Sequence, residues 1–262
     1  MDTVEVGCLD VVPSAADVLA RIARAAGDAI TSVTRKDLRE TRKADASPVT
    51  EADRAAHTVI LRELAAWTPT VPVISEEGTI PPYETRRSWR QFWLVDPLDG
   101  TKEFLTGSGE YTVNIAMIEA GTPVLGVVYA PALDLLYVAG RELGAWRHEA
   151  GGEPARLSST PARAGAPLVV AESRSHPSAE LEAYLQTIPV ARRVRAGSSL
   201  KFCWLADGQA DIYPRFGRTM EWDTAAGDCV FRYSGRDCVR PSPLGYNSPT
   251  LAHERFIIGG EA

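Results

Sequence analysis

The stretch WLVDPLDGTKEF, residues 93–104, places two carboxylates, Asp96 and Asp99, directly after an apolar run. The run is typical of a buried strand, and residues three positions apart share one side of a helical turn, so a turn that starts at Pro97 makes the two side chains converge. Neighbouring anions repel each other, and a divalent cation such as Mg²⁺, which prefers oxygen ligands, removes the repulsion. A plain Pro/Gly turn is the alternative, and the dipeptides alone favour it equally.

Gly100 and Thr101 follow the aspartates at the start of the next segment. Their backbone N–H groups are expected to point outward from a helix start, where a phosphate group can bind.

Three further acidic motifs stand at the expected starts or ends of elements: VISEEG with Glu76 and Glu77, EWDTAAGDC with Asp223, and SPVTEAD with Asp53. Each has a simpler interpretation. A Glu pair is often a solvated strand end, Asp is a favoured helix cap, and Asp53 has the spacing of a capping box with Thr50. Taken together in an acidic protein, they are explained more economically by one shared metal site.

The composition excludes several classes of protein. The 262-residue chain is 45% hydrophobic and 24% charged, which is typical of a globular protein, and its formal charge is −6. An acidic balance argues against a general binder of nucleic acid or anionic membrane. The sequence shows no apolar run of about 20 residues and no secretory signal.

Four scattered cysteines, Cys8, Cys203, Cys229 and Cys238, form no metal-binding or redox pair. They are therefore expected to be reduced, buried thiols of a cytoplasmic protein.

Periodic apolar positions predict two helices, over 14–33 and 50–67. Short apolar runs bounded by Gly and Pro then predict a largely antiparallel sheet, with strands at 71–75, 92–96, 112–120, 123–130 and 135–140.

A Gly-rich polar segment over 149–165 is the predicted internal boundary. Beyond it strands and helices alternate: strands at 167–173, 191–197 and 209–216, and helices at 178–187, 198–207 and 223–234. The pattern predicts an α+β half over residues 1–150 packed on an α/β half over residues 151–262.

The acidic motifs, taken in chain order, resemble the signature of the lithium-sensitive, Mg²⁺-dependent phosphomonoesterases. The residues that carry the resemblance are Asp53, Glu76-Glu77, DPLDGT at 96–101 and Trp222-Asp223. These include inositol monophosphatases, fructose bisphosphatases and 3′(2′),5′-bisphosphate nucleotidases. The resemblance implies a layered α-β-α-β-α sandwich of the inositol monophosphatase and fructose bisphosphatase type, with a metal-binding first half and a second half that completes the nucleotide pocket.

Several stretches are similar to the CysQ-type bisphosphate nucleotidases within that superfamily. They are KADASPVTEAD, DPLDGTKEF, SRSH at 173–176, GSSLKFC at 197–203 and ADIYPRFGRTMEWDTAAGD. Inositol monophosphatases typically continue the second motif as GTTNF. The final motif has Ala225-Ala226-Gly227 where the family often has a Gly-Gly pair, which makes inositol phosphates a less convincing substrate.

The resemblance implies a site with two or three Mg²⁺ ions, held by Glu76, Asp96, Asp99, Asp223 and the backbone carbonyl of Leu98. Thr101, oriented by Asp53, is the candidate to accept a proton from the attacking water, and Glu76 is the rival base. The N–H groups of Gly100 and Thr101 are expected to stabilise charge on the phosphoryl oxygens.

The implied reaction is hydrolysis of 3′-phosphoadenosine 5′-phosphate to AMP and phosphate, with 3′-phosphoadenylyl sulfate as a second substrate, in sulfate assimilation or nucleotide recycling. Besides Asp223, the candidate substrate contacts are Gly100, Thr101, Lys102, Glu103, Ser198, Ser199, Lys201, and, for the distal 5′-phosphate, Arg174 and Arg215. Ordinary surface charge is the alternative for Lys201 and the two arginines.

Two other functions stay open from the sequence, namely an inositol monophosphatase and a non-catalytic sensor of nucleotide or metal. A cytoplasmic homodimer that binds no nucleic acid, and inhibition by lithium, complete the expectations.

Overall fold

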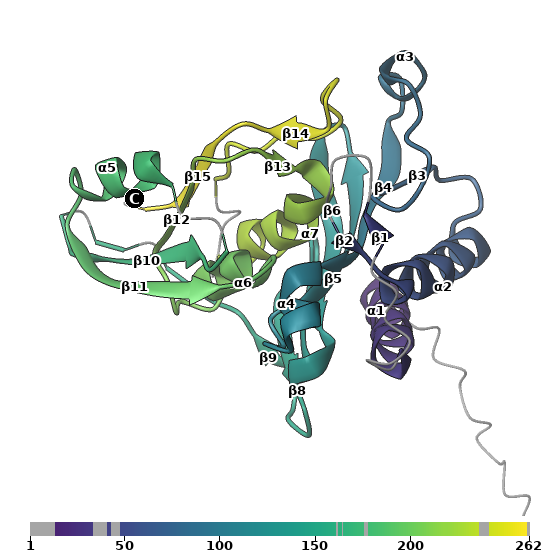
Figure 1. Cartoon of the computed structure of the whole chain (residues 1–262), viewed down its shortest axis with the longest axis horizontal. Coiled ribbons are helices and arrows are strands. Elements are labelled where there is room, and N and C mark those ends of the chain that lie inside the picture. Colours follow the sequence, from purple (N-terminus) through teal and green to yellow (C-terminus); the bar gives the residue numbers. More distant parts are fainter. Residues whose placement is uncertain are drawn as a thin grey trace, which may run out of the picture.

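The computed structural model describes residues 14–33, 41–42, 48–160, 162–163, 165–175, 178–235 and 241–260 (Figure 1). Cys8, Cys238, His176 of the SRSH motif and residues 43–47 of the KADASPVTEAD motif lie outside the described residues. The helices are α1 (Ala15–Ser32), α2 (Glu51–Trp67), α3 (Tyr83–Arg86), α4 (Thr101–Thr106), α5 (Ala179–Leu185), α6 (Leu200–Ala206) and α7 (Glu221–Arg232), with a 3₁₀ turn at Pro131–Leu133.

A seven-stranded sheet forms the centre of the first half. In spatial order it contains β3 (Val73–Ser75), β4 (Gln91–Asp99), β5 (Thr112–Glu119), β6 (Thr122–Ala130), β7 (Leu135–Gly140), β8 (Gly144–Glu149) and β9 (Ala155–Arg156). Neighbouring strands are antiparallel except β3 and β4, which are parallel. The predicted meandering, largely antiparallel sheet is confirmed.

A four-stranded sheet forms the second half, in the order β11 (Val190–Ala196), β10 (Leu168–Ser173), β12 (Ile212–Arg215) and β15 (Phe256–Gly259). The first three strands are parallel, and β15 is antiparallel to β12. The remaining strands form two short antiparallel pairs, β1 (Thr41–Arg42) with β2 (Pro48–Val49) and β13 (Thr219–Met220) with β14 (Ala252–His253).

Both faces of the large sheet are buried, as its continuous apolar strands require. On β4, Trp93 and Val95 pack with helices α1 and α2, whereas Phe92 and Leu94 face the opposite way and pack with α6 and α7. The four-stranded sheet lies against the other side of α6 and α7, and α5 covers its outer face through Leu181. This order of layers confirms the α-β-α-β-α sandwich (Figure 1).

The predicted halves share one apolar core, because the cluster around α7 includes Phe92 of β4 and Phe256 of β15. The division of the chain into two halves at residue 150 stays a prediction. The predicted helix over 198–207 begins only at Leu200, since Ser198 has a left-handed backbone (φ 48°) that a helix cannot include.

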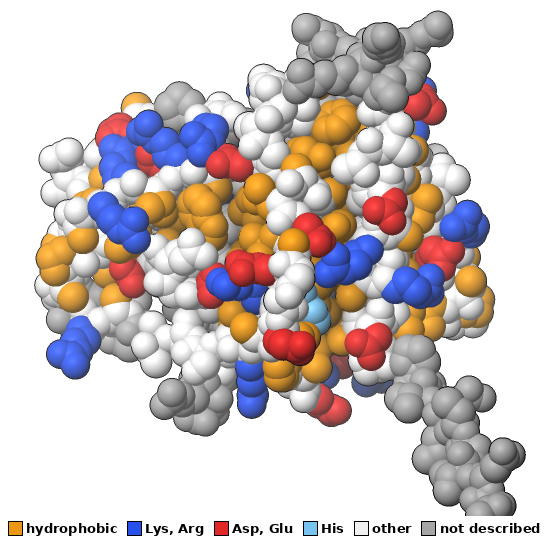
Figure 2. Space-filling view, turned by 90° about the horizontal axis from the view of Figure 1, so that it is seen from below, with side chains coloured by type: hydrophobic (Ala, Val, Ile, Leu, Met, Phe, Trp, Pro, Cys, Tyr) orange, Lys and Arg blue, Asp and Glu red, His pale blue; other side chains and the backbone are white. Residues whose placement is uncertain are grey.

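Of the four cysteines, Cys203 and Cys229 are buried free thiols, as predicted. In the described part of the chain, no helix combines the length and the apolar character needed to cross a membrane. The face drawn in Figure 2 carries acidic and basic side chains interspersed among apolar ones.

Helix α7 lies unusually close to the large sheet at Gly126 of β6. A Cβ atom at this position would stand 2.8 Å from Cβ of Cys229 and 3.4 Å from Cα of Ala226. Because the first distance is shorter than a van der Waals contact, a larger residue would push α7 away from the sheet.

We therefore expect Gly126→Ala to lower the free energy of unfolding by about 1–3 kcal/mol, measured by urea denaturation. Gly245→Ala is the matched control, because no described atom lies within 4 Å of the Cβ it adds. Equal stability of the two variants would contradict the close packing.

Candidate active site

Two carboxylates meet where β3 and β4 run side by side. The strands are parallel with Ser75 opposite Val95, so the next residues, Glu76 and Asp96, are neighbours at the same edge of the sheet. The N–H of Glu76 continues the ladder by donating to the carbonyl of Val95 at 3.1 Å. The strand-end position predicted for Glu76 is thus the feature that brings it to Asp96.

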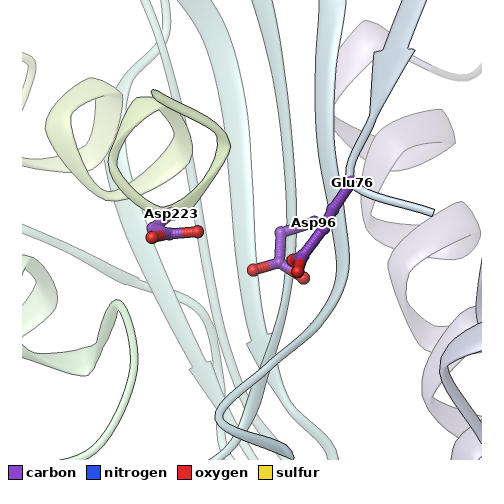
Figure 3. Close-up of side chains that lie close together, drawn as sticks. All are labelled: Glu76, Asp96 and Asp223. Carbon is purple, nitrogen blue, oxygen red and sulfur yellow. The ribbon is translucent and has the colours of Figure 1, made fainter. Parts of the chain in front are cut away.

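Asp223 joins them from the first turn of α7 (Figure 3). One carboxylate oxygen from each of Glu76, Asp96 and Asp223 lies within 4.8 Å of the other two. Asp223 also accepts the N–H of Met220 at 3.0 Å, so the interpretations as helix cap and as site residue are compatible.

The electrostatics of this group favour a cation. Burial raises the pKa of Asp96 well above its ordinary value, and the nearby charges that raise it further are all carboxylates, those of Glu76, Asp99, Asp223 and Asp53. Burial, with Asp99 and Glu76, likewise raises the pKa of Asp223. Mg²⁺ binds oxygen at about 2.1 Å, which puts opposite ligand atoms about 4.2 Å apart, so small side-chain movements would fit the group to the ion.

Asp99 reaches the same side of the sheet through a β-bulge. Asp96 is opposite Asn114 and Asp99 is opposite Thr112, so two residues of β4, Pro97 and Leu98, face one residue of β5, Val113. Without the extra residue, side chains three positions apart on a strand point to opposite faces. The prediction of a helical turn that starts at Pro97 is therefore wrong. Strand β4 continues to Asp99, and the bulge, not a turn, brings the two carboxylates to the same side.

Asp99 lies beside the group of three rather than within it. Its carboxylate accepts a hydrogen bond from Asn114 Nδ2 at 3.3 Å. Burial raises the pKa of Asp99, while Lys201 opposes this rise. Leu98 is buried and donates its N–H to Asp96 Oδ1 at 3.0 Å. Metal binding by Asp99 and by the Leu98 carbonyl stays a prediction.

Thr101 and Asp53 are in contact, as the family resemblance implied. Asp53 Oδ2 accepts the N–H and the hydroxyl of Thr50, at 2.8 and 2.6 Å, which completes the capping box of α2. The other oxygen, Oδ1, accepts the Thr101 hydroxyl at 3.4 Å. Burial raises the pKa of Asp53, and the two bonds from Thr50 oppose this rise. One carboxylate thus caps a helix and orients a hydroxyl.

Gly100 explains why the chain can turn so tightly before α4. Its φ of 92° is left-handed, and an added Cβ would lie 3.3 Å from the carbonyl oxygen of Glu110. Glycine is the residue that adopts this conformation without strain.

A cavity of about 270 Å³ opens beside these groups. Its lining includes ten of the predicted site residues: Glu76, Asp99, Gly100, Thr101, Lys102, Glu103, Ser198, Lys201, Arg215 and Asp223. It also includes residues that the sequence reasoning missed, among them Ser173, Tyr213 and Thr219. Ser173 ends β10 and Tyr213 lies on β12, so the rule that ligands bind at the carboxyl ends of parallel strands could have indicated this region.

Lys201 supplies a buried cation to this cavity. Its ammonium group donates to the carbonyls of Ala196, at 3.3 Å, and Ser198, and lies 5.5 Å from the centre of the Tyr213 ring. Burial lowers the pKa of Lys201 to about 8, and the charge of Asp99 limits the decrease. The lining of the cavity thus combines carboxylates with two cations, Lys201 and Arg215.

Two predicted substrate contacts have other partners. Ser199 is buried, and its hydroxyl donates to the carbonyl of Asp223 at 2.6 Å. The Arg174 guanidinium is held by both carboxylate oxygens of Glu110, at 2.7 and 2.8 Å. Neither Ser199 nor Arg174 is among the residues that line the cavity.

Comparison with known proteins identifies the family. The model of the inositol monophosphatase family matches residues 14–259. The chain belongs to the inositol monophosphatase family. It is 52% identical over 221 residues to the 3′(2′),5′-bisphosphate nucleotidase CysQ of Escherichia coli K12, covering 84% of this chain and 87% of that protein.

Solved structures show the same relationship. CysQ from Bacteroides thetaiotaomicron superposes with a TM-score of 0.79 at 38% identity, over 94% of this chain and 97% of that one. The extragenic suppressor protein SuhB from Bartonella henselae gives a TM-score of 0.71 at 26% identity, over 93% of each chain. The predicted membership of this superfamily and the predicted fold are confirmed.

The carboxylate group yields a test that does not need substrate. We expect Asp96→Asn to stabilise the metal-free protein by about 1 kcal/mol, because it removes a buried charge among like charges while keeping an oxygen for the N–H of Leu98. It should also abolish the rise in melting temperature that Mg²⁺ gives the unaltered protein. Differential scanning calorimetry in EDTA and in Mg²⁺ measures both effects.

Glu172→Gln is the matched control, since Glu172 is equally buried but is paired with Arg193 and Arg195. It should destabilise the protein and leave the Mg²⁺ effect intact. A destabilised Asp96→Asn protein that still responds to Mg²⁺ would refute a metal site at Asp96.

Proposed function

We propose that this protein is a Mg²⁺-dependent phosphomonoesterase that hydrolyses 3′-phosphoadenosine 5′-phosphate to AMP and phosphate, and also accepts 3′-phosphoadenylyl sulfate. The observation that carries the proposal is the convergence of Glu76, Asp96 and Asp223 beside a cavity that is also lined by Lys201 and Arg215. Such a cavity suits an anionic ester that is bound both by metal and by cationic side chains. The similarity to the curated CysQ nucleotidases supports the choice of substrate.

The residues that would hold Mg²⁺ are Glu76, Asp96 and Asp223, with Asp99 and the Leu98 carbonyl as further candidates. When bound, such ions neutralise phosphate charge and lower the pKa of a coordinated water. Two or three ions are the number that the family resemblance implies.

The chain itself handles the proton. In the hydrolysis, a water oxygen bonds to phosphorus, the bond from phosphorus to the ribose 3′ oxygen breaks, and that oxygen takes up a proton. Because the Thr101 hydroxyl donates to Asp53 Oδ1, its oxygen lone pairs face away and can accept a hydrogen bond from the water. The proton of the water passes to the Asp53–Thr101 pair. Glu76, which also lines the cavity, is the rival base.

Two kinds of hydrogen-bond donor, backbone N–H groups and cationic side chains, would stabilise the negative charge of the substrate's phosphate groups. The N–H groups of Gly100 and Thr101 begin α4 at the rim of the cavity and can donate to phosphoryl oxygens. Lys201 and Arg215 lie in the second half of the chain, where they suit the ribose or the distal phosphate. Lys102 and Glu103 complete the lining next to these N–H groups.

Relaxed inositol monophosphatase activity is the nearest alternative, and the motif tail Lys102-Glu103 together with the CysQ relatives argues for the nucleotide. A non-catalytic sensor is less well supported, since both the carboxylate group and the Asp53–Thr101 contact are present. A cytoplasmic location, a homodimer and the absence of nucleic-acid binding stay predictions.

A panel of phosphate-release assays tests the function. We expect kcat/KM for 3′-phosphoadenosine 5′-phosphate to exceed that for inositol 1-phosphate by at least about 100-fold, because polar groups arranged for one ligand are left unpaired by another. Activity should need Mg²⁺, disappear in EDTA and fall in Li⁺. A preference for inositol 1-phosphate would overturn the proposed substrate.

Replacement of Thr101 separates the two candidate bases. We expect Thr101→Ala to reduce kcat about 100-fold through loss of proton transfer, with Mg²⁺ binding measured by calorimetry unchanged. Thr101→Ser, which keeps the hydroxyl, should retain most of the activity. Nearly full activity of Thr101→Ala would instead assign the base to Glu76.

A further inference from the structure

Glu110 and Arg174 form a contact that joins the two halves of the chain at the edge of the site. Arg174 Nε and Nη2 donate to the two oxygens of Glu110 at 2.8 and 2.7 Å, and Nη2 also donates to the carbonyl of Arg195 at 2.9 Å. Such bidentate contacts have a fixed geometry that an ion pair with a single hydrogen bond lacks. All these donors on Arg174 are therefore occupied within the protein, which leaves it poorly suited to bind a substrate phosphate.

The carboxylate of Glu110 has a third donor, the N–H of Gly197 at 2.9 Å. Burial would raise the pKa of Glu110, but the bonds from Arg174 and Gly197 outweigh it, so the pKa is lowered. The backbones also touch, because a Cβ on Gly197 would lie 2.5 Å from the Glu110 carbonyl oxygen. The segment before β5 and the turn 197–199 before α6 are thus held in contact by the Glu110 carboxylate and by close backbone packing.

The turn 197–199 reaches the carboxylates of the site from this position. The Ser199 hydroxyl donates to the carbonyl of Asp223 at 2.6 Å, and the Ser199 backbone N–H is near enough to Asp99 to oppose the rise in the pKa of that carboxyl. The Ser198 hydroxyl pairs with Thr112 Oγ1 at 2.8 Å. One turn therefore contacts both Asp99, at the end of β4, and Asp223, at the start of α7.

We propose that the Glu110–Arg174 pair is a latch that fixes the turn 197–199 and, through Ser199, positions Asp99 and Asp223 for metal binding. Arg174 is then a positioning residue, not a ligand of the distal phosphate. Neither Glu110 nor Arg174 lines the cavity, so the pair acts on the site through Gly197, which does line it and donates its N–H to Glu110. This inference rests on the proposed metal-dependent function.

A double-mutant cycle tests the latch. Arg174→Gln and Glu110→Gln should each weaken Mg²⁺ binding to the metal-free protein about ten-fold in isothermal titration calorimetry, since residues behind the ligands tune metal affinity. The double variant should show the same loss of about ten-fold, because either change alone opens the contact.

Glu119→Gln is the matched control. It breaks the pair between Glu119, the last residue of β5, and Arg141, which follows β7. This pair has a similar exposure and a distance of 3.0 Å, and its loss should leave Mg²⁺ binding unchanged. Thermal melts verify that all variants fold. Unchanged Mg²⁺ binding in a folded single variant, or additive losses in the double variant, would overturn the latch.

Kinetics distinguish a latch from a phosphate ligand. If Arg174 acts through the latch, Arg174→Gln should lower kcat/KM by the same factor for 3′-phosphoadenosine 5′-phosphate and for adenosine 3′-monophosphate. Glu110→Gln should lower both values by that same factor. A rise in KM confined to the substrate with a 5′-phosphate would assign Arg174 to that phosphate and refute the proposal. The calorimetric measurements of Mg²⁺ binding need no turnover, so they test the latch independently of the reaction. If the unaltered protein fails to hydrolyse the nucleotide, the proposed function is refuted, and the Mg²⁺ affinities of the variants still confirm or refute the latch.

Discussion

The repulsion between buried carboxylates is the constraint on which the rest of this structure depends. Glu76 and Asp96 come from neighbouring parallel strands, and Asp223 comes from the helix packed over them. Each element is stable for ordinary reasons of apolar packing, but their ends bring negative charge into a region with little water. Such a group is costly alone and becomes favourable when a divalent cation binds, which couples folding to the proposed chemistry.

Backbone features hold these carboxylates where side-chain packing alone would not. The bulge in β4 turns Asp99 to the same side as Asp96, and the left-handed Gly100 lets α4 begin directly after it. The missing side chain of Gly126 lets α7 approach the sheet closely enough to bring Asp223 across. In each case the backbone decides the position of a charged neighbour, and at Gly100 and Gly126 it is the missing side chain that allows the geometry.

The distribution of charge in the cavity follows from the layered fold. The carboxylates come mainly from the edge of the seven-stranded sheet, whereas Lys201 and Arg215 come from α6 and β12. The turn 197–199 connects the two sets, because it contacts Asp99 and Asp223 and supplies a carbonyl to the Lys201 ammonium. An anionic ligand in the cavity would therefore contact both halves of the chain at once.

The sequence by itself determined the largely antiparallel sheet of the first half, the alternation of strands and helices in the second, and the capping box at Thr50 and Asp53, because these depend on local periodicity and on short motifs. The layered fold, the family and the pairing of Asp53 with Thr101 followed from the resemblance of several motifs to a known family. The sequence could not determine the bulge at 96–99, the real partner of Arg174, or the use of the Ser199 hydroxyl by Asp223. Each of these depends on a contact between residues distant in the chain. Only the packing of α7 and the turn 197–199 against the large sheet decides which side chains are free for a ligand and which hold the site together.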